Sequence, residues 1–135
     1  MRPLSPVPQR KELLSPTGFL TPVWSTWFRD LFERLKVVRG DVSTSGDENA
    51  TISPNVYYHA VTALTAGRTL TLPATADCED GHTLTIQDES GAAGSFAITI
   101  QRAGSDTVNG STSTSISSNY GRRVLIKRGT GWFSA

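Results

Sequence analysis

Five carboxylates in the second half of the chain come closest to a catalytic set. They lie in two short polar segments, as Asp77, Glu79, Asp80, Asp88 and Glu89. Hydrolysis of a glycosidic bond needs two such groups at a fixed separation. Both segments are also rich in turn-forming residues, and Asp is common in turns because its side chain bonds to nearby backbone. We therefore expect these carboxylates to shape turns, and we expect the chain not to be an enzyme.

Metal and thiol chemistry have few residues to use. The chain has one cysteine, Cys78, and two histidines, His59 and His82. One cysteine excludes an intrachain disulfide framework, and these three residues cannot close a structural zinc site by themselves. The acidic neighbours of Cys78 favour its neutral thiol. The acidic run at residues 47–49 lacks the further ligands of a calcium loop. We expect no metal and no cofactor.

Charge and hydropathy argue against two classes of partner. Thirteen Lys and Arg residues balance twelve Asp and Glu residues, for a net charge of +1. Nucleic-acid binding would need clustered basic residues, and the densest group, at residues 122–128, flanks an apolar triplet as in a protected edge strand. No apolar run reaches the roughly 18 residues of a membrane span. Residues 1–6 lack the apolar core of a signal peptide, so we expect synthesis in the cytoplasm.

A repeated phrase organises the second half of the chain. It occurs at residues 68–72 (RTLTL), 82–86 (HTLTI) and 96–100 (FAITI), with starts 14 residues apart. Apolar residues on alternate positions predict half-buried strands. Turn-rich connections and further short strands predict an antiparallel β domain over residues 55–135, built as a sandwich, barrel or stacked ribbon. If the phrases pair side by side, Thr71, Thr85 and Thr99 form a ladder on an exposed face, and the apolar face closes within the chain or against other copies.

An amphipathic helix is predicted from Pro22 to about Arg39, within a segment of residues 21–40. Proline suits the first helical position and Gly40 suits the end. Apolar residues are spaced 4, 3, 4 and 3 apart, and Trp27 and Phe32 widen the stripe. The seam of about two and a half heptads favours self-association or docking on a partner, although packing on its own domain is the alternative. The expected interface residues are Trp24, Trp27, Phe28, Leu31, Leu35 and Val38.

The segments on either side of this helix are polar or rich in proline. Residues 1–20 contain four prolines, which favours an extended arm. The arm is a disordered tail or a peptide that lies along another subunit, and we favour docking because it carries the apolar residues Leu13, Leu14, Phe19 and Leu20. Residues 41–54 are rich in Ser, Thr, Asp and Asn, and we expect them to form a solvated linker.

Exposed aromatic residues would be the natural site for a sugar. Tyr57, Tyr58, Tyr120 and Trp132 are the candidates for stacking on a glycan. Aromatic side chains also supply much of the core and interface area of proteins. Packing inside the β domain or between subunits is therefore the interpretation that we favour.

An ordered set of motifs in the β region resembles a module of tailed-bacteriophage virion proteins. The motifs are residues 80–88 (DGHTLTIQD), 91–94 (GAAG), 98–100 (ITI), 106–110 (DTVNG), 118–121 (SNYG) and 129–133 (GTGWF). The module recurs in small tail-fibre, collar-fibre and head-fibre proteins. The helix at residues 23–32 (VWSTWFRDLF), after a proline-rich arm, also resembles the start of such proteins.

The resemblance implies a homotrimeric, non-enzymatic structural component of a virion. The arm and the helix would attach to the particle, through the portal, a tail adaptor or a longer fibre, and the β domain would project. A short tail or collar fibre, or connector, fits this description. A capsid decoration or head-fibre protein and a carbohydrate-binding module for host attachment are the alternatives.

Overall fold

The chain divides at Gly40 into two compact units, Met1–Gly40 and Asp41–Ala135. The computed structural model describes residues 22–135, apart from the side chains of residues 22–23 and 34–39. In the first unit the helix α1 (Pro22–Arg39) has the bounds that the sequence predicts. Gly40 follows it with a φ of 71°, a conformation that glycine adopts readily and that commonly ends helices. The predicted arm of residues 1–20 lies outside the described residues.

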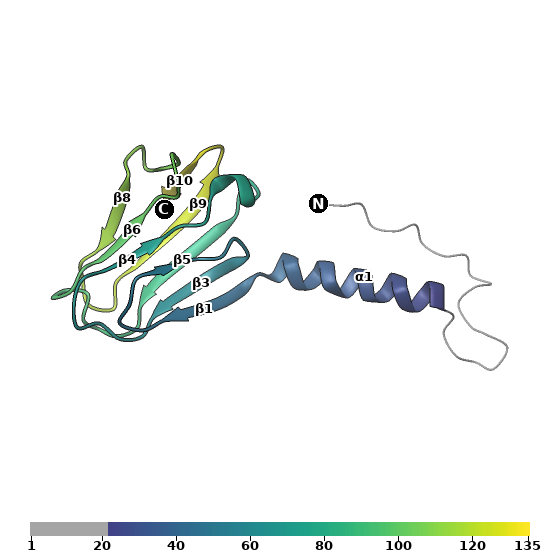
Figure 1. Cartoon of the computed structure of the whole chain (residues 1–135), viewed down its shortest axis with the longest axis horizontal. Coiled ribbons are helices and arrows are strands. Elements are labelled where there is room, and N and C mark those ends of the chain that lie inside the picture. Colours follow the sequence, from purple (N-terminus) through teal and green to yellow (C-terminus); the bar gives the residue numbers. More distant parts are fainter. Residues whose placement is uncertain (1–21) are drawn as a thin grey trace. The chain divides into compact units, whose positions relative to one another are not determined.

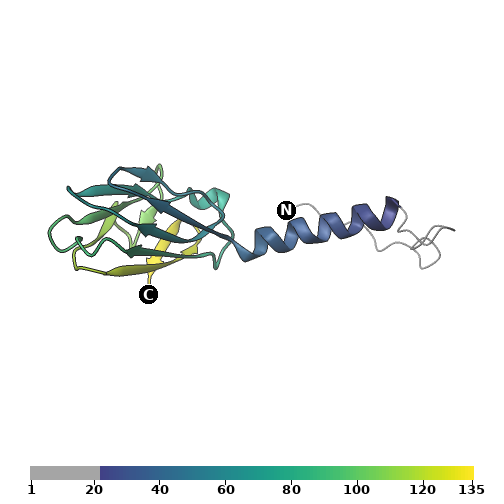
Figure 2. The same ribbon diagram turned by 90° about the horizontal axis from the view of Figure 1, so that it is seen from below.

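The second unit is a two-layered β structure, and the described chain is mainly β, as predicted (Figure 1, Figure 2). One sheet has six strands, in the order β1 (Asp41–Ser45), β3 (Val56–Val61), β5 (Thr83–Asp88), β9 (Arg122–Arg128), β10 (Gly131–Ser134) and β7 (Thr107–Val108). The other has four, in the order β2 (Ala50–Thr51), β4 (Arg68–Thr71), β6 (Ile98–Gln101) and β8 (Ser113–Ile116). A short 3-10 turn, η2 (Thr75–Asp77), lies between β4 and β5. No described helix is long and apolar enough to cross a membrane.

The sheets are mixed, so the prediction of an antiparallel domain is wrong. The first six strands alternate between the two sheets as the chain proceeds. Among these six, strands that are two apart in sequence run in the same direction and pair in parallel, as β1 with β3, β3 with β5, and β4 with β6. Antiparallel pairing begins with β8 and β9, which lie beside β6 and β5 respectively.

This alternation also separates the three repeated phrases. The first and third, in β4 and β6, are neighbours in the four-stranded sheet, whereas the middle phrase is β5 of the other sheet. Thr71 pairs with Gln101 and Thr99 with Thr69, so the expected ladder of Thr71, Thr85 and Thr99 does not form. The apolar residues of the phrases face each other across the sandwich. Six of them have no solvent exposure: Leu70, Leu72, Leu84, Ile86, Ile98 and Ile100. The apolar face of the repeat is thus closed within one chain.

The expected linker of residues 41–54 belongs instead to the β unit. It contains β1 and β2, and Ile52 is 2% exposed in the core. Asp47 accepts hydrogen bonds from Arg68 Nε (2.7 Å), from the Thr65 backbone N–H (3.1 Å) and from the Thr65 hydroxyl. Short hydroxyl side chains fit a half-buried pleated edge. The polar composition therefore reflects an edge strand and a fixed turn.

The basic residues of β9 do not protect an edge, contrary to the prediction. β9 lies between β5 and β10, near the middle of the six-stranded sheet. Lys127 points inward and is 8% exposed, and its Nζ donates to Asp80 Oδ1 at 2.8 Å. The positive charge is tolerated there because it is paired.

Candidate partner-binding surfaces

Three aromatic rings pack against one another along α1. The ring centroids of Trp24 and Trp27 are 5.7 Å apart, those of Trp27 and Phe28 are 5.2 Å apart, and those of Trp24 and Phe28 are 5.8 Å apart. Residues three and four apart share one helix face, and two of the three contacts are edge-to-face, a favoured geometry. Leu31 continues this face and is half-buried, whereas Phe32 is 65% exposed. We call Trp24, Trp27, Phe28 and Leu31 the aromatic stripe.

The two indole groups of the stripe are notable for their hydrogen bonding within the described part of the chain. The Nε1 atoms of Trp24 and Trp27 are buried and have no hydrogen-bond partner among the described residues. Leaving a buried donor unpaired costs about 1–3 kcal/mol, so this arrangement of the two indoles carries a cost in free energy. The other predicted docking residues cannot be compared, because their side chains lie outside the described residues: Leu35, Val38, Leu13, Leu14, Phe19 and Leu20.

Asp88 is a fully buried carboxylate at the end of β5. Its Oδ1 accepts hydrogen bonds from the backbone N–H groups of Ser90 (3.0 Å) and Gly91 (3.1 Å) and from the Ser90 hydroxyl (2.5 Å). Its Oδ2 accepts from the backbone N–H groups of Ala93 and Tyr120, both at 3.0 Å. Burial favours the neutral acid, but these hydrogen bonds outweigh it, so the pKa of Asp88 lies below its usual value. One carboxylate thus holds two separate loops together.

We call the Asp88 carboxylate with its five hydrogen bonds the Asp88 clamp. Tyr120, whose backbone N–H it holds, has a sparsely populated backbone conformation. Its φ is 58°, and Gln87 Nε2 donates to its carbonyl oxygen at 2.8 Å. Its ring lies over Gly91, where a Cβ atom would come within 2.4 Å of the ring Cζ. The neighbouring Asn119 accepts a hydrogen bond from the Gly94 backbone N–H at 2.8 Å. The Tyr120 side chain is 69% exposed, so the loops present a fixed aromatic ring to solvent.

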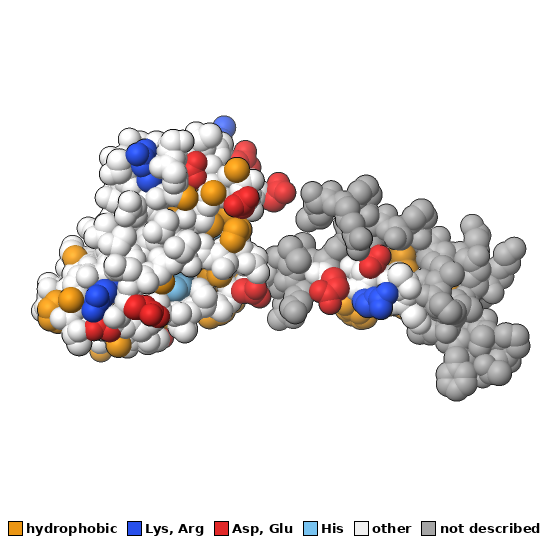
Figure 3. Space-filling model, viewed as in Figure 1, with side chains coloured by type: hydrophobic (Ala, Val, Ile, Leu, Met, Phe, Trp, Pro, Cys, Tyr) orange, Lys and Arg blue, Asp and Glu red, His pale blue; other side chains and the backbone are white. Residues whose placement is uncertain are grey.

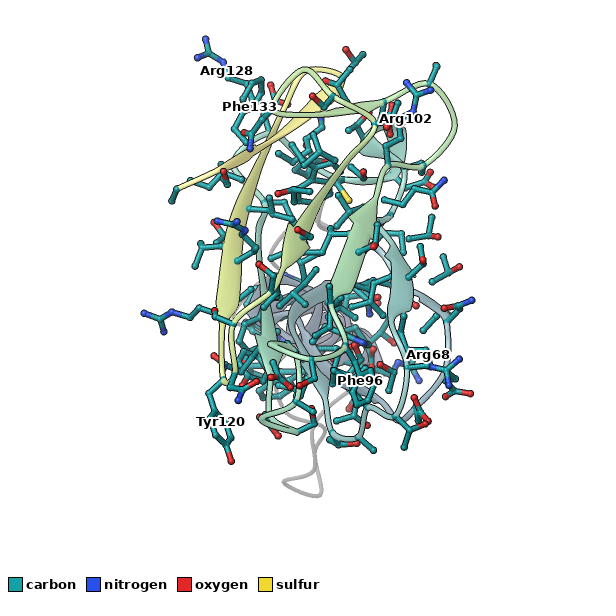
Figure 4. The ribbon with its side chains drawn as sticks, turned by 90° about the vertical axis from the view of Figure 1, so that its left-hand side faces the viewer. Arg68, Phe96, Arg102, Tyr120, Arg128 and Phe133 are labelled. Carbon is teal, nitrogen blue, oxygen red and sulfur yellow. The ribbon has the colours of Figure 1, made fainter. Side chains whose placement is uncertain are left out.

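The two exposed tyrosines among the predicted stacking residues lie at opposite ends of the sandwich. Tyr57 is near the start of β3, and Tyr120 is held at the end of the parallel strand β5. Four to five residues of strand separate these levels by roughly 15 Å. Figure 4 shows Tyr120 at the same end as Phe96 and Arg68. Tyr120 therefore cannot form one compact sugar site with Tyr57.

Trp132 does not offer a face to a ligand, so its candidate stacking role is wrong and the favoured interpretation, packing inside the β domain, is confirmed for this residue. The side chain is fully buried, its Nε1 donates to the Pro73 carbonyl oxygen at 3.3 Å, and its ring meets that of His82 edge-on at 5.9 Å. The strand period explains the difference, because successive side chains point to opposite faces. Trp132 points inward beside Lys127, and the next residue, Phe133, points outward and is 48% exposed.

The first group of turn carboxylates has a structural anchor. Asp80 accepts hydrogen bonds from Lys127 Nζ at 2.8 Å and from the Gly129 backbone N–H at 2.9 Å. The Lys127 hydrogen bond is the main reason that the pKa of Asp80 lies below its usual value. Asp77 and Glu79 are exposed in the same segment. Figure 3 shows acidic side chains gathered over the part of the β unit that contains η2.

The second group of turn carboxylates is also engaged. Asp88 has the five hydrogen bonds described above, and Glu89 Oε1 accepts a hydrogen bond from the Tyr58 hydroxyl at 2.8 Å. That bond is the main reason that the pKa of Tyr58 is raised. The contacts of Asp80, Asp88 and Glu89 fix loops and strands, which agrees with turn chemistry for these residues.

Two further titratable side chains, His59 and Cys78, are buried or partly buried in the β unit. His59 is 3% exposed, and its Nδ1 and Nε2 share hydrogen bonds with the hydroxyls of Ser43 (2.7 Å) and Ser45 (3.0 Å). Burial lowers the pKa of His59. Burial also raises the pKa of the Cys78 thiol, which disfavours the reactive thiolate. Among the residues that the structure describes, no group of three or more His, Cys, Asp or Glu side chains could hold a metal ion.

Comparison with models of protein families finds no match for this chain, and comparison with curated proteins finds none either. The sequence at residues 88–91 signals a tight turn at Asp88. The hydrogen bond between Asp88 and the Tyr120 backbone joins residues that are 32 apart in sequence. No local sequence pattern predicts a contact over that separation.

Proposed function

We propose that this chain is a non-enzymatic structural component of a bacteriophage virion, a short trimeric tail or collar fibre or connector. The arm and α1 attach the protein to the particle, and the β unit projects from it. The number of three copies and the virion location come from the resemblance of the β motifs and the helix to small phage fibre proteins. The attachment partner would be a portal, a tail adaptor or a longer fibre.

The observation that carries the proposal is an aromatic stripe on a helix outside the β core. All core residues of the β unit fall between Ile52 and Trp132, so no described residue of α1 is needed to complete that core. The stripe nevertheless has the width and composition of a packed surface, including two indole N–H groups without described partners. Amphipathic helices of this kind are stabilised mainly by tertiary or quaternary packing, because short isolated helices are marginal in water.

Particle incorporation tests the proposal. We expect virions made with a chain that lacks residues 1–39 to lose the protein, while the truncated chain remains folded in the infected cell. Imaging of intact particles made with the full chain would place it at the tail or collar. Density on the capsid shell would instead support a decoration or head-fibre protein. Normal incorporation of the truncated chain would contradict the attachment role of the arm and helix.

One observation favours a second function, carbohydrate binding by the β unit. The Tyr120 backbone is held by Asp88 and its exposed ring lies over Gly91, so little loop entropy would be lost on stacking against a sugar. A glycan-array signal that is retained by Tyr120→Phe and Tyr57→Phe but lost in Tyr120→Ala would support it. Equal binding by Tyr120→Ala and by the unchanged chain would exclude a stacking role for this ring.

A further inference from the structure

The outward face of the six-stranded sheet carries apolar side chains that the sandwich core does not use. Pairing places Val42, Tyr58, Thr85 and Val124 in one row across β1, β3, β5 and β9. A second row contains Thr83, Ile126 and Phe133. Val42 is 59% exposed, Ile126 40% and Phe133 48%. We call Val42, Tyr58, Val124, Ile126 and Phe133 the outer apolar face.

The other sheet has an outward face of opposite character. Its rows consist of Thr and Ser hydroxyls and one amide, from Thr51, Thr71, Gln101 and Ser113 in one row and Thr69, Thr99 and Ser115 in the next. A shallow hollow of about 380 Å³ between Asn49 and Gln101 is lined by this polar surface. The large exposed apolar residues of the β unit lie instead on the six-stranded sheet or in loops. The two faces are therefore not equivalent toward a partner.

We propose that the outer apolar face is a second contact between copies of this chain, an inference that rests on the proposed homotrimer. Burying exposed apolar groups on adjacent strands against another surface removes them from water and lowers the free energy of the complex. Arg122 and Arg128 bracket Val124 and Ile126 along β9, and Glu89 accepts a hydrogen bond from the Tyr58 hydroxyl. A surface with charges of both signs at its rim can pair them with those of an identical chain.

The size of the face also fits a second copy that is already held nearby. Five strands at about 4.8 Å spacing and about five residues at 3.3 Å give roughly 400 Å². A stable specific interface buries about 800 Å² on each partner. The outer apolar face alone therefore supplies about half of that area, and α1, which is about 27 Å long, supplies a further strip. Each contact is weak alone, and tethering by one raises the effective concentration for the other.

Cysteine labelling tests which sheet is covered in the assembled chain. In a Cys78→Ser background, Ile126→Cys places a thiol on the outer apolar face, and Gln101→Cys places one on the polar sheet. Both positions are exposed in the single chain. We expect a maleimide to label position 126 at least tenfold more slowly than position 101 at concentrations where the full chain is oligomeric. After dissociation by dilution the two rates should agree within about threefold.

A matched pair of charge variants gives an independent measurement. Ile126→Lys with Phe133→Lys should raise the protein concentration at which the oligomer dissociates by tenfold or more. Gln101→Lys with Thr51→Lys should leave that concentration unchanged. An oligomer in which positions 126 and 101 label equally fast, or in which both double variants dissociate alike, would overturn the sheet contact and leave helix-driven assembly intact. A chain that is monomeric at all concentrations would overturn the homotrimer as well.

Discussion

The carboxylate of Asp88 accepts a hydrogen bond from the backbone N–H of Tyr120 at 3.0 Å, although 32 residues separate them. The same buried group satisfies three backbone N–H groups of its own loop. We expect Asp88→Ala to destabilise the β unit by roughly 2–4 kcal/mol, because several buried donors lose their acceptor at once. Chemical denaturation measures this. Asp77→Ala, at an exposed turn position, should change stability by less than about 0.5 kcal/mol; equal losses in both variants would contradict the clamp.

Gly91 and Gly81 provide a test of how the Tyr120 ring is held. Both have positive φ, +72° and +89°, but only Gly91 has the ring above it, whereas Gly81 has no atom within 4 Å of an added Cβ. Alanine at either position should cost about 1–2 kcal/mol for the backbone conformation. Only Gly91→Ala should also move the Tyr120 ring, seen as a change in its NMR ring-proton shifts. Unchanged shifts in Gly91→Ala would show that the ring does not rest on Gly91.

The spacing of hydrophobic residues and the positions of glycine, proline and other turn formers allow much of the fold to be predicted from the sequence. The helix bounds, the β character of residues 55–135 and the strands of the repeated phrases all follow from local pattern. Strand partners do not, because Leu70 and Leu84 show the same alternation yet lie in different sheets. Likewise, the polar composition of β1 gave no sign of its pairing with β3.

The candidate site divides in the same way between local and long-range information. The aromatic stripe could be predicted because spacings of three and four residues fix one helix face. Trp132 could not be assigned as buried from its type alone, since its orientation depends on the register of β10 with β9. The exposure of Tyr120 depends on Asp88 and Gly91, which approach it only in the folded chain.

Buried His59 should make stability depend on pH near neutrality. Its pKa in the folded chain is lowered by burial, whereas in the unfolded chain it titrates near about 6.5. The unfolded state therefore binds more protons as pH falls, and the free energy of unfolding decreases below about pH 6.5, by at most about 1.4 kcal/mol per pH unit for one proton. Denaturation at pH 7.5 and 5.5 measures the decrease, which should shrink in His59→Gln. An equal decrease in the variant would assign the effect to other groups.

The aromatic stripe should control assembly without affecting the β unit. Replacing Trp24, Trp27 and Phe28 with alanine together should weaken self-association by at least a hundredfold, because the buried aromatic area is lost. Ser25→Ala with Thr26→Ala, on exposed positions of the same helix, should leave association within about threefold of the original. Thermal unfolding of the β unit should be the same for both variants when each is monomeric. Weakening by the serine and threonine variant to the same extent would point to the other helix face.

The mass of the intact chain in solution tests the central claim of a homotrimer most directly. Sedimentation equilibrium on the full 135-residue chain should give three times the 14.5 kDa of one copy, and residues 41–135, which contain a complete core, should be largely monomeric at micromolar concentration. A single species of one chain mass across the accessible concentration range would contradict the proposed trimeric fibre.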